Sequence, residues 1–132
     1  MKRLLCSLTL LVLCLGLAMA KGGAEIKFDK TSHDFGKFTE DNAVVSYTFT
    51  FTNVGDGPLV IHQAVASCGC TVPDYTQEPV LPGKTGTVKV TYNGTGRTPG
   101  HFKKSITLRT NAKTEMLRLY IEGEMAPAKN DK

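Results

Sequence analysis

Strict alternation of apolar and polar side chains is the feature that most constrains the fold of this chain. From residue 45 to residue 52, apolar and hydroxyl-bearing residues alternate, and the apolar positions are Val45, Tyr47, Phe49 and Phe51. A period of two places the two sets on opposite faces of a β-strand. One apolar face and one polar face are typical of a half-buried antiparallel strand.

The same pattern recurs along the chain. It covers residues 88–92, 105–109 and 117–122, a more uniformly apolar run covers 59–66, and Ile26 and Phe28 begin a further strand. Turn chemistry separates these runs at residues 53–58, at Leu81-Pro82-Gly83 and at residues 93–100. No stretch carries a helical stripe. We therefore predict an all-β protein, an immunoglobulin-like sandwich of about seven to eight antiparallel strands.

The N-terminal segment is typical of an export signal. Lys2 and Arg3 precede an apolar run over residues 4–17, and residues 18–20 (Ala-Met-Ala) match a cleavage site. An alternative is lipoprotein processing at Cys14, although the large Leu13 does not suit a lipobox. We predict a signal peptide at 1–20, a sandwich domain at 21–125 and a flexible tail at 126–132, with no membrane span in the mature chain.

Charge excludes one class of partner. Loss of Lys2 and Arg3 leaves 14 basic against 12 acidic residues, and no basic block with interleaved aromatics exists. Nucleic-acid binding is therefore not expected. No serine, histidine and aspartate spacing indicates a catalytic set, so we expect no enzyme and no cofactor.

The cysteine pair in Ser67-Cys68-Gly69-Cys70-Thr71 is the most distinctive chemical motif. These two cysteines remain after Cys6 and Cys14 leave with the signal peptide. Residues i and i+2 of an extended chain share a face, with Cα atoms near the upper limit for a disulfide, so Gly69 has to bend the chain for a bond to close. Such a small ring adds little entropic stabilisation and is expected to be strained and readily reduced.

Three interpretations of Cys68 and Cys70 stay open. They form a structural disulfide or capped thiols, a redox-active pair, or two soft ligands for copper or zinc. His62, six residues before Cys68, is the candidate third metal ligand. A structural zinc needs four ligands, and this spacing is not a standard zinc pattern.

Several phrases in order resemble one family. They are Phe28-Asp29, His33-Asp34-Phe35-Gly36, Tyr47-Thr48-Phe49 with Phe51-Thr52-Asn53, the Cys-Gly-Cys-Thr motif at 68–71, and Leu81-Pro82-Gly83. Residues 25–124 resemble the secreted bacterial immunoglobulin-like domain of unknown function related to Hydin-type and major-sperm-protein-like sandwiches. The resemblance implies a sandwich of seven to eight strands, an exported location, no established chemistry and a cysteine pair typical of these domains.

These observations predict a monomeric, exported, non-enzymatic binding or scaffold domain of the bacterial envelope, periplasmic or extracellular. Its partner is expected to be another envelope protein or a surface polymer, held by end loops or by an exposed edge strand. The candidate surfaces are the loop at residues 67–82, which carries the cysteines, and the loop at residues 93–101. The alternative function is a thiol-based redox or soft-metal site at Cys68 and Cys70.

Overall fold

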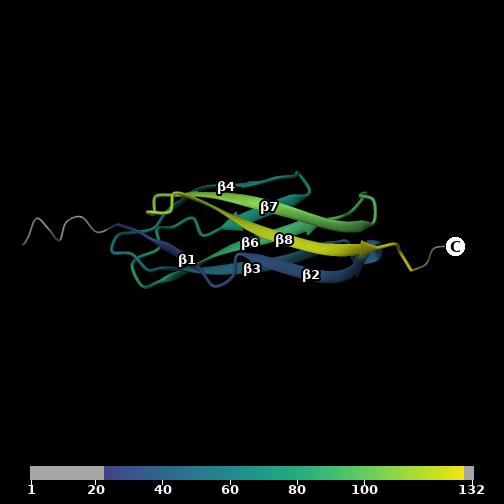
Figure 1. Ribbon diagram of the computed structural model, residues 1–132, viewed down its shortest axis with the longest axis horizontal. Coiled ribbons are helices and arrows are strands. Elements are labelled where there is room, and N and C mark those ends of the chain that lie inside the picture. Colours follow the sequence, from purple (N-terminus) through teal and green to yellow (C-terminus); the bar gives the residue numbers. More distant parts are fainter. Residues whose placement is uncertain (1–22, 130–132) are drawn as a thin grey trace, which may run out of the picture.

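The chain forms eight strands in a computed structural model that describes residues 23–129 (Figure 1). The strands are β1 (Ile26–Phe28), β2 (Ser32–Thr39), β3 (Val44–Asn53), β4 (Ile61–Ala66), β5 (Thr71–Tyr75), β6 (Thr85–Asn93), β7 (Gly100–Thr110) and β8 (Met116–Ala126), with a 3-10 turn η2 (Glu40–Asn42) after β2. The predicted signal peptide lies outside the described residues and stays a prediction. No helix in the described range is long and apolar enough to cross a membrane.

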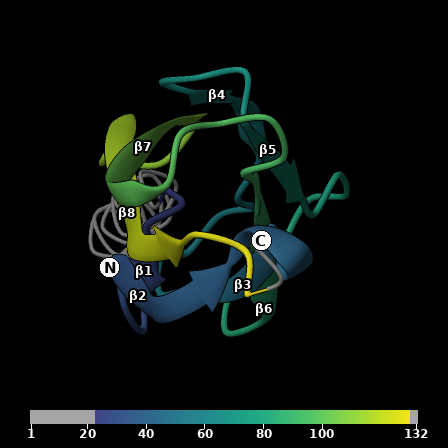
Figure 2. The same ribbon diagram turned by 90° about the vertical axis from the view of Figure 1, so that its right-hand side faces the viewer.

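Two four-stranded sheets pack face to face, in the orders β1-β3-β6-β5 and β2-β8-β7-β4 (Figures 1 and 2). This confirms the predicted all-β sandwich. One pairing departs from the expectation of antiparallel strands, because β2 runs parallel to β8. A hairpin forces antiparallel pairing only on strands joined by a short turn. β2 and β8 come from opposite ends of the domain, so no such turn fixes their direction.

Two of the strands were not predicted. β2 carries the mixed sequence SHDFGKFT, with a register shift between Asp34 and Lys37 where Gly36 adopts φ 70°. β5 is TVPDY and lies in the segment that was expected to be a loop. Proline and aspartate are depleted in strands, and a bulge interrupts the period of two. Both strands are sheet edges, where pairing to a single neighbour tolerates such residues.

The core follows the predicted alternation. Within one sheet, Phe49 of β3 pairs with Val88 of β6, Tyr47 pairs with Val90, and Phe51 pairs with Gly86. The largest fully buried side chains also include Leu59, Ile106, Leu108, Leu119, Ile121 and Met125. Each belongs to the apolar set of its strand or to a segment that closes an end of the sandwich. Burial of these side chains is the main source of stability in a domain with so small a disulfide ring.

A buried polar residue closes one end of this core. Asn53 has no exposed surface, and its Nδ2 donates to the carbonyls of Gly57 at 2.7 Å and Val80 at 2.8 Å. Its Oδ1 accepts from the backbone N–H of Gly55 at 3.0 Å and of Glu25 at 3.3 Å. The predicted local turn around Asn53 is confirmed. The bonds to Glu25 and Val80 additionally tie two segments that are distant in sequence.

At one edge of the sandwich, the ring of His33 on β2 stacks on Tyr47 of β3, with centroids 3.7 Å apart. The rings belong to different sheets, so the stack closes that edge. The Nδ1 atom of His33 is buried without a hydrogen-bond partner among the described residues. Burial lowers the pKa of His33 below its usual 6.5, the positive charge of Lys30 lowers it further, and Asp34 opposes both.

The depressed pKa of His33 predicts a stability loss in mild acid. The folded protein binds this proton less readily than the unfolded chain, so the contribution is present above pH 6.5 and is lost as the pH falls toward the folded pKa. The replacement His33→Phe keeps an aromatic stack and removes the titration. We expect urea unfolding between pH 7.5 and 5 to give a flatter stability profile for this variant. An unchanged profile would assign the acid sensitivity to another group.

Candidate functional site

The cysteine motif forms the crossover between the two sheets. The chain leaves β4 of one sheet at Ala66 and enters β5 of the other at Thr71. On the β4 side, the Ser67 N–H donates to the Ser105 carbonyl at 2.9 Å. On the β5 side, the Asn93 N–H donates to the Cys70 carbonyl at 2.8 Å. The crossover is therefore anchored to β7 and to the end of β6.

The two cysteines are joined in a disulfide, with Cα atoms 5.2 Å apart. A turn brings them together, because the Thr71 N–H donates to the Cys68 carbonyl at 3.2 Å. Cys70 is only 6 % exposed and belongs to the core, whereas Cys68 is half-buried. The Sγ of Cys68 accepts the Cys70 N–H at 3.1 Å, and the Sγ of Cys70 lies 3.6 Å from the Thr71 hydroxyl. A reagent in solvent therefore reaches Cys68 more readily than Cys70.

His62 is not part of this motif. It lies exposed near the start of β4, at the opposite end of that strand from the cysteines. Within residues 23–129, no group of three or more histidine, cysteine or acidic side chains is placed to hold a metal ion. The proposed set of Cys68, Cys70 and His62 is thus not brought together. Cys68 and Cys70 alone offer two sulfur atoms, and these are bonded to each other.

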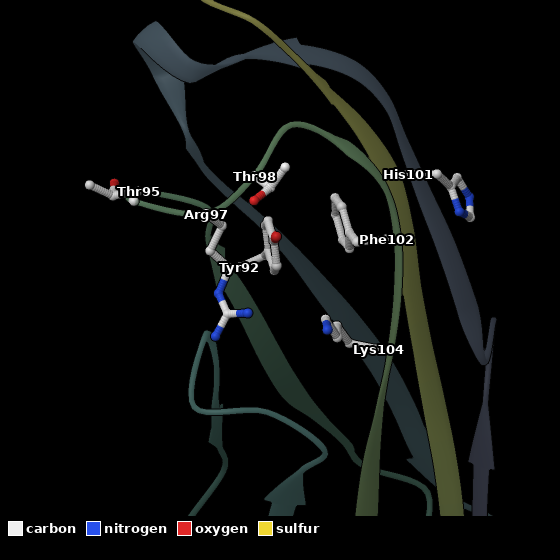
Figure 3. Close-up of a pocket in the computed structure, with 8 residues that line it drawn as sticks. Tyr92, Thr95, Arg97, Thr98, His101, Phe102 and Lys104 are labelled. Atoms are coloured by element: carbon white, nitrogen blue, oxygen red, sulfur yellow. The ribbon is translucent and has the colours of Figure 1, made fainter.

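The second predicted surface, residues 93–101, lies beside the crossover and contributes to a hollow of about 610 Å³. Figure 3 shows Arg97, Thr98 and Lys104 grouped around the rings of Tyr92 and Phe102. The two rings stack in parallel with centroids 3.9 Å apart and form its floor. His101, whose Nε2 lies 3.4 Å from Glu122, projects away from this group.

Lys104 was missed as a site residue, although the sequence contained a signal for it. The core-facing side chains of β7 include Phe102, Ile106 and Leu108. Lys104 has the same alternation along the strand and therefore points to the same face. A lysine in an apolar set breaks the pattern that otherwise predicts the core face. In the structure the pairing of β4 with β7 ends near the hydrogen bond from the Ser67 N–H to the Ser105 carbonyl. Lys104 therefore lies just beyond the part of β7 that pairs with β4.

The outer edge of β4 presents free backbone groups. Among the strands that the structure describes, β4 pairs only with β7. Because the Ser67 N–H bonds to β7, antiparallel alternation turns the backbone groups of Val65 toward β7 and those of Ala64 and Ala66 away from it. The Val65 side chain is 50 % exposed. In the end view of Figure 2, β4 lies at the margin of the molecule.

The other edge strands are protected against added strands. β1 has three residues, and β2 carries Asp34, Lys37 and a bulge. In β5, bonds at Cys70 and Thr76 to β6 set the alternation, which turns the backbone of Pro73 outward. Proline has no N–H to offer a new strand, and short length, charges and bulges also discourage pairing. β4 has a bulge at its start, between Ile61 and Gln63, but neither proline nor a formal charge.

A family model matches residues 26–125, which is most of the chain and all but the last residue of the strands. Its description is "Protein of unknown function (DUF1573)". The chain belongs to this DUF1573 family. A search of curated proteins gave no match. Membership agrees with the predicted domain of unknown function, whereas the kinship with Hydin-type and major-sperm-protein-like domains stays a prediction.

Solved structures similar to this DUF1573 domain support its fold. A protein of unknown function from Porphyromonas gingivalis W83 is 18 % identical with a TM-score of 0.63, and the match covers 78 % of this chain and 46 % of that one. The PapD-like domain 7 of human CEP192 is 13 % identical with a TM-score of 0.63, covering 81 % and 89 %. The chaperone DraB of E. coli is 11 % identical with a TM-score of 0.53, covering 83 % and 58 %. The chain thus spans less than half of the P. gingivalis protein.

Proposed function

We propose that this DUF1573 domain is an exported, non-enzymatic binding module that takes up an extended segment of another envelope protein along the outer edge of β4. The observation that carries the proposal is the state of that edge. Ala64 and Ala66 offer outward backbone donors and acceptors, and neither proline nor a formal charge opposes an added strand. Main-chain pairing supplies affinity in this mode, and alternate side chains supply selectivity.

Side chains beside the edge suit this mode. Val65 is 50 % exposed and lies on the outer face of the sheet, where it offers a contact for a side chain of the added strand. Val72 of β5 is 59 % exposed but lies next to the blocked position of Pro73. Several structurally similar proteins are chaperones by name, among them DraB of E. coli and the periplasmic chaperone SfaE. These likenesses support the choice of a protein partner.

The test uses peptides selected from a random decapeptide phage library against the folded protein. We expect the selected peptides to protect the amides of Ala64 and Ala66 from hydrogen exchange, because their N–H groups enter a new ladder. Ala64→Pro removes one outward donor, and Val65→Lys places a charge beside the edge. Each variant is expected to weaken peptide binding by about tenfold or more, because Ala64→Pro removes one hydrogen bond and Val65→Lys removes one apolar contact.

Val72→Lys is the matched control, since it replaces a valine of similar exposure on an edge strand of the other sheet. It should leave binding unchanged. Peptides that bind without protecting the β4 amides, or that tolerate Val65→Lys as well as Val72→Lys, would overturn the proposal. A library that yields no binder in the micromolar range would argue against peptide capture altogether.

A second candidate function is thiol–disulfide exchange at the crossover, favoured by the unequal exposure of the two sulfurs. A thiolate of a partner protein would attack Sγ of the half-buried Cys68, forming a mixed disulfide and breaking the bond to Cys70. Cys70 would leave as a thiolate, 3.6 Å from the Thr71 hydroxyl, and take up a proton. The partner supplies the electrons in this step, because its thiol becomes oxidised.

The double replacement Cys68→Ala with Cys70→Ala separates the two candidates. A disulfide that closes a three-residue ring is worth about 1.5 kcal/mol by chain entropy, so we expect a loss of that size in urea unfolding. Peptide binding at β4 should survive if the domain is a binding module. The exchange candidate would be removed if the double variant lost about 1.5 kcal/mol without any change in peptide affinity, and if the single variant Cys70→Ala formed no mixed disulfide when incubated with oxidised glutathione.

A further inference from the structure

We propose that the hollow between β6 and β7 is a binding site for a hydrophilic organic anion, such as a carboxylated or phosphorylated sugar. Its lining consists of Tyr92, Thr95, Gly96, Arg97, Thr98, His101, Phe102 and Lys104. Among residues 23–129, the lining contains basic, hydroxyl and aromatic residues with one glycine, and no acidic residue. This site is separate from the β4 edge and does not depend on peptide binding there.

The charges of the hollow call for an anion. Arg97 and Lys104 group on one side of the Tyr92 ring (Figure 3). Within the described range the only ion pair among the lining residues is that of His101 with Glu122, and His101 projects away from the group. Two cations that share a hollow without a counter-charge repel each other. A bound carboxylate or phosphate removes that repulsion and accepts charge-assisted hydrogen bonds from both.

The position of Lys104 points the same way. Its neighbours in the core-facing set of β7, Phe102 and Ile106, are buried, so Lys104 points toward the space between the sheets and is itself half-buried. Lys104 therefore contributes a positive charge to the lining of the hollow (Figure 3). Lys103, the adjacent lysine, points to the opposite face, where its Nζ lies 5.5 Å from the centre of the Tyr120 ring.

The volume of the hollow and its lining residues indicate what the ligand carries besides its anionic group. A volume of about 610 Å³ exceeds what inorganic phosphate requires and falls in the range of small-molecule sites. The hydroxyls of Thr95 and Thr98 offer donors and acceptors to a polyhydroxylated ligand. Tyr92 and Phe102 are 3 % and 8 % exposed and stacked on each other, so they form a rigid floor instead of a cleft for apolar side chains.

The test compares three sugars that differ only at one carbon substituent. Glucose, glucuronate and glucose 6-phosphate are titrated into isotope-labelled protein at low ionic strength, and amide shifts are followed by NMR. We expect one or both anions, but not glucose, to shift the amides of residues 95–98 and 104. The anion that binds with the higher affinity shows whether the site prefers a carboxylate or a phosphate. Added salt should weaken binding, as for any ion pair at a solvent-open site.

Variants decide whether the two cations make the site. Arg97→Gln and Lys104→Gln are each expected to weaken anion binding by about tenfold, the usual effect of losing a hydrogen bond from a charged group. Lys103→Gln is the matched control, and it should leave the affinity unchanged. Equal shifts with glucose, no shifts with either anion, or an equal loss in Lys103→Gln and Lys104→Gln would overturn the proposal. Peptide binding at β4 should be intact in all three variants.

Discussion

Replacement of Asn53 by alanine is expected to destabilise the domain by about 3 kcal/mol or more. Asn53 has no exposed surface. Its amide serves four backbone groups, and the replacement leaves the N–H of Glu25 and Gly55 and the carbonyls of Gly57 and Val80 without this partner. Each group left unsatisfied in a buried place costs about 1–3 kcal/mol, although water can reach the less buried ones.

Two further variants locate the cause of the Asn53 effect. Asn53→Asp keeps the acceptor oxygen and replaces the donor with a buried negative charge that faces two carbonyls, so it should be at least as destabilising. Asn93→Ala is the matched control. Asn93 is exposed, and its side chain accepts one local bond, from the Thr95 N–H at 3.0 Å. We expect a loss below about 1 kcal/mol there. Equal urea midpoints for Asn53→Ala and Asn93→Ala would contradict the proposed role of the buried network.

Gly86→Ala is expected to cost about 2–3 kcal/mol, because it overpacks the core. Gly86 pairs with Phe51 across β3 and β6, and the Phe51 ring lies over the space where a Cβ would stand. The Cε2 and Cε1 atoms of the ring would be only 2.9 and 3.0 Å from that Cβ. The ring has no exposed surface and is packed against Phe28, with centroids 5.3 Å apart, so it has little freedom to move.

A double-mutant cycle tests this contact. Phe51→Leu alone should destabilise by about 1–2 kcal/mol through lost packing. In the double variant the smaller leucine leaves room for the new methyl group, so the combined loss should be clearly smaller than the sum of the two single losses. Thermal and urea unfolding of the four proteins provide the measurement. Additive losses would mean that the Phe51 ring does not limit the space at Gly86.

Part of the candidate site could be predicted from the sequence. The cysteine pair, its turn and the end loop at 93–101 were recognised, because glycine, proline and cysteine act through local geometry. The partnership between these segments was not predictable. It rests on two backbone hydrogen bonds between residues far apart in the chain, from the Asn93 N–H to the Cys70 carbonyl and from the Ser67 N–H to the Ser105 carbonyl. Lys104 lines the hollow at a point where β7 no longer pairs with β4, and the sequence does not show where that pairing ends.

The sequence by itself determined the class of fold and most of the core, because a period of two sorts side chains onto two faces whatever the strand pairs with. It also determined the turns at Asn53 and Gly83, which depend on neighbours in the chain. Only the tertiary structure decided which strands are edges, that β2 runs parallel to β8, and that β4 is left unprotected. Those properties depend on long-range pairing, and a strand's own residues do not encode which side of it a partner will occupy.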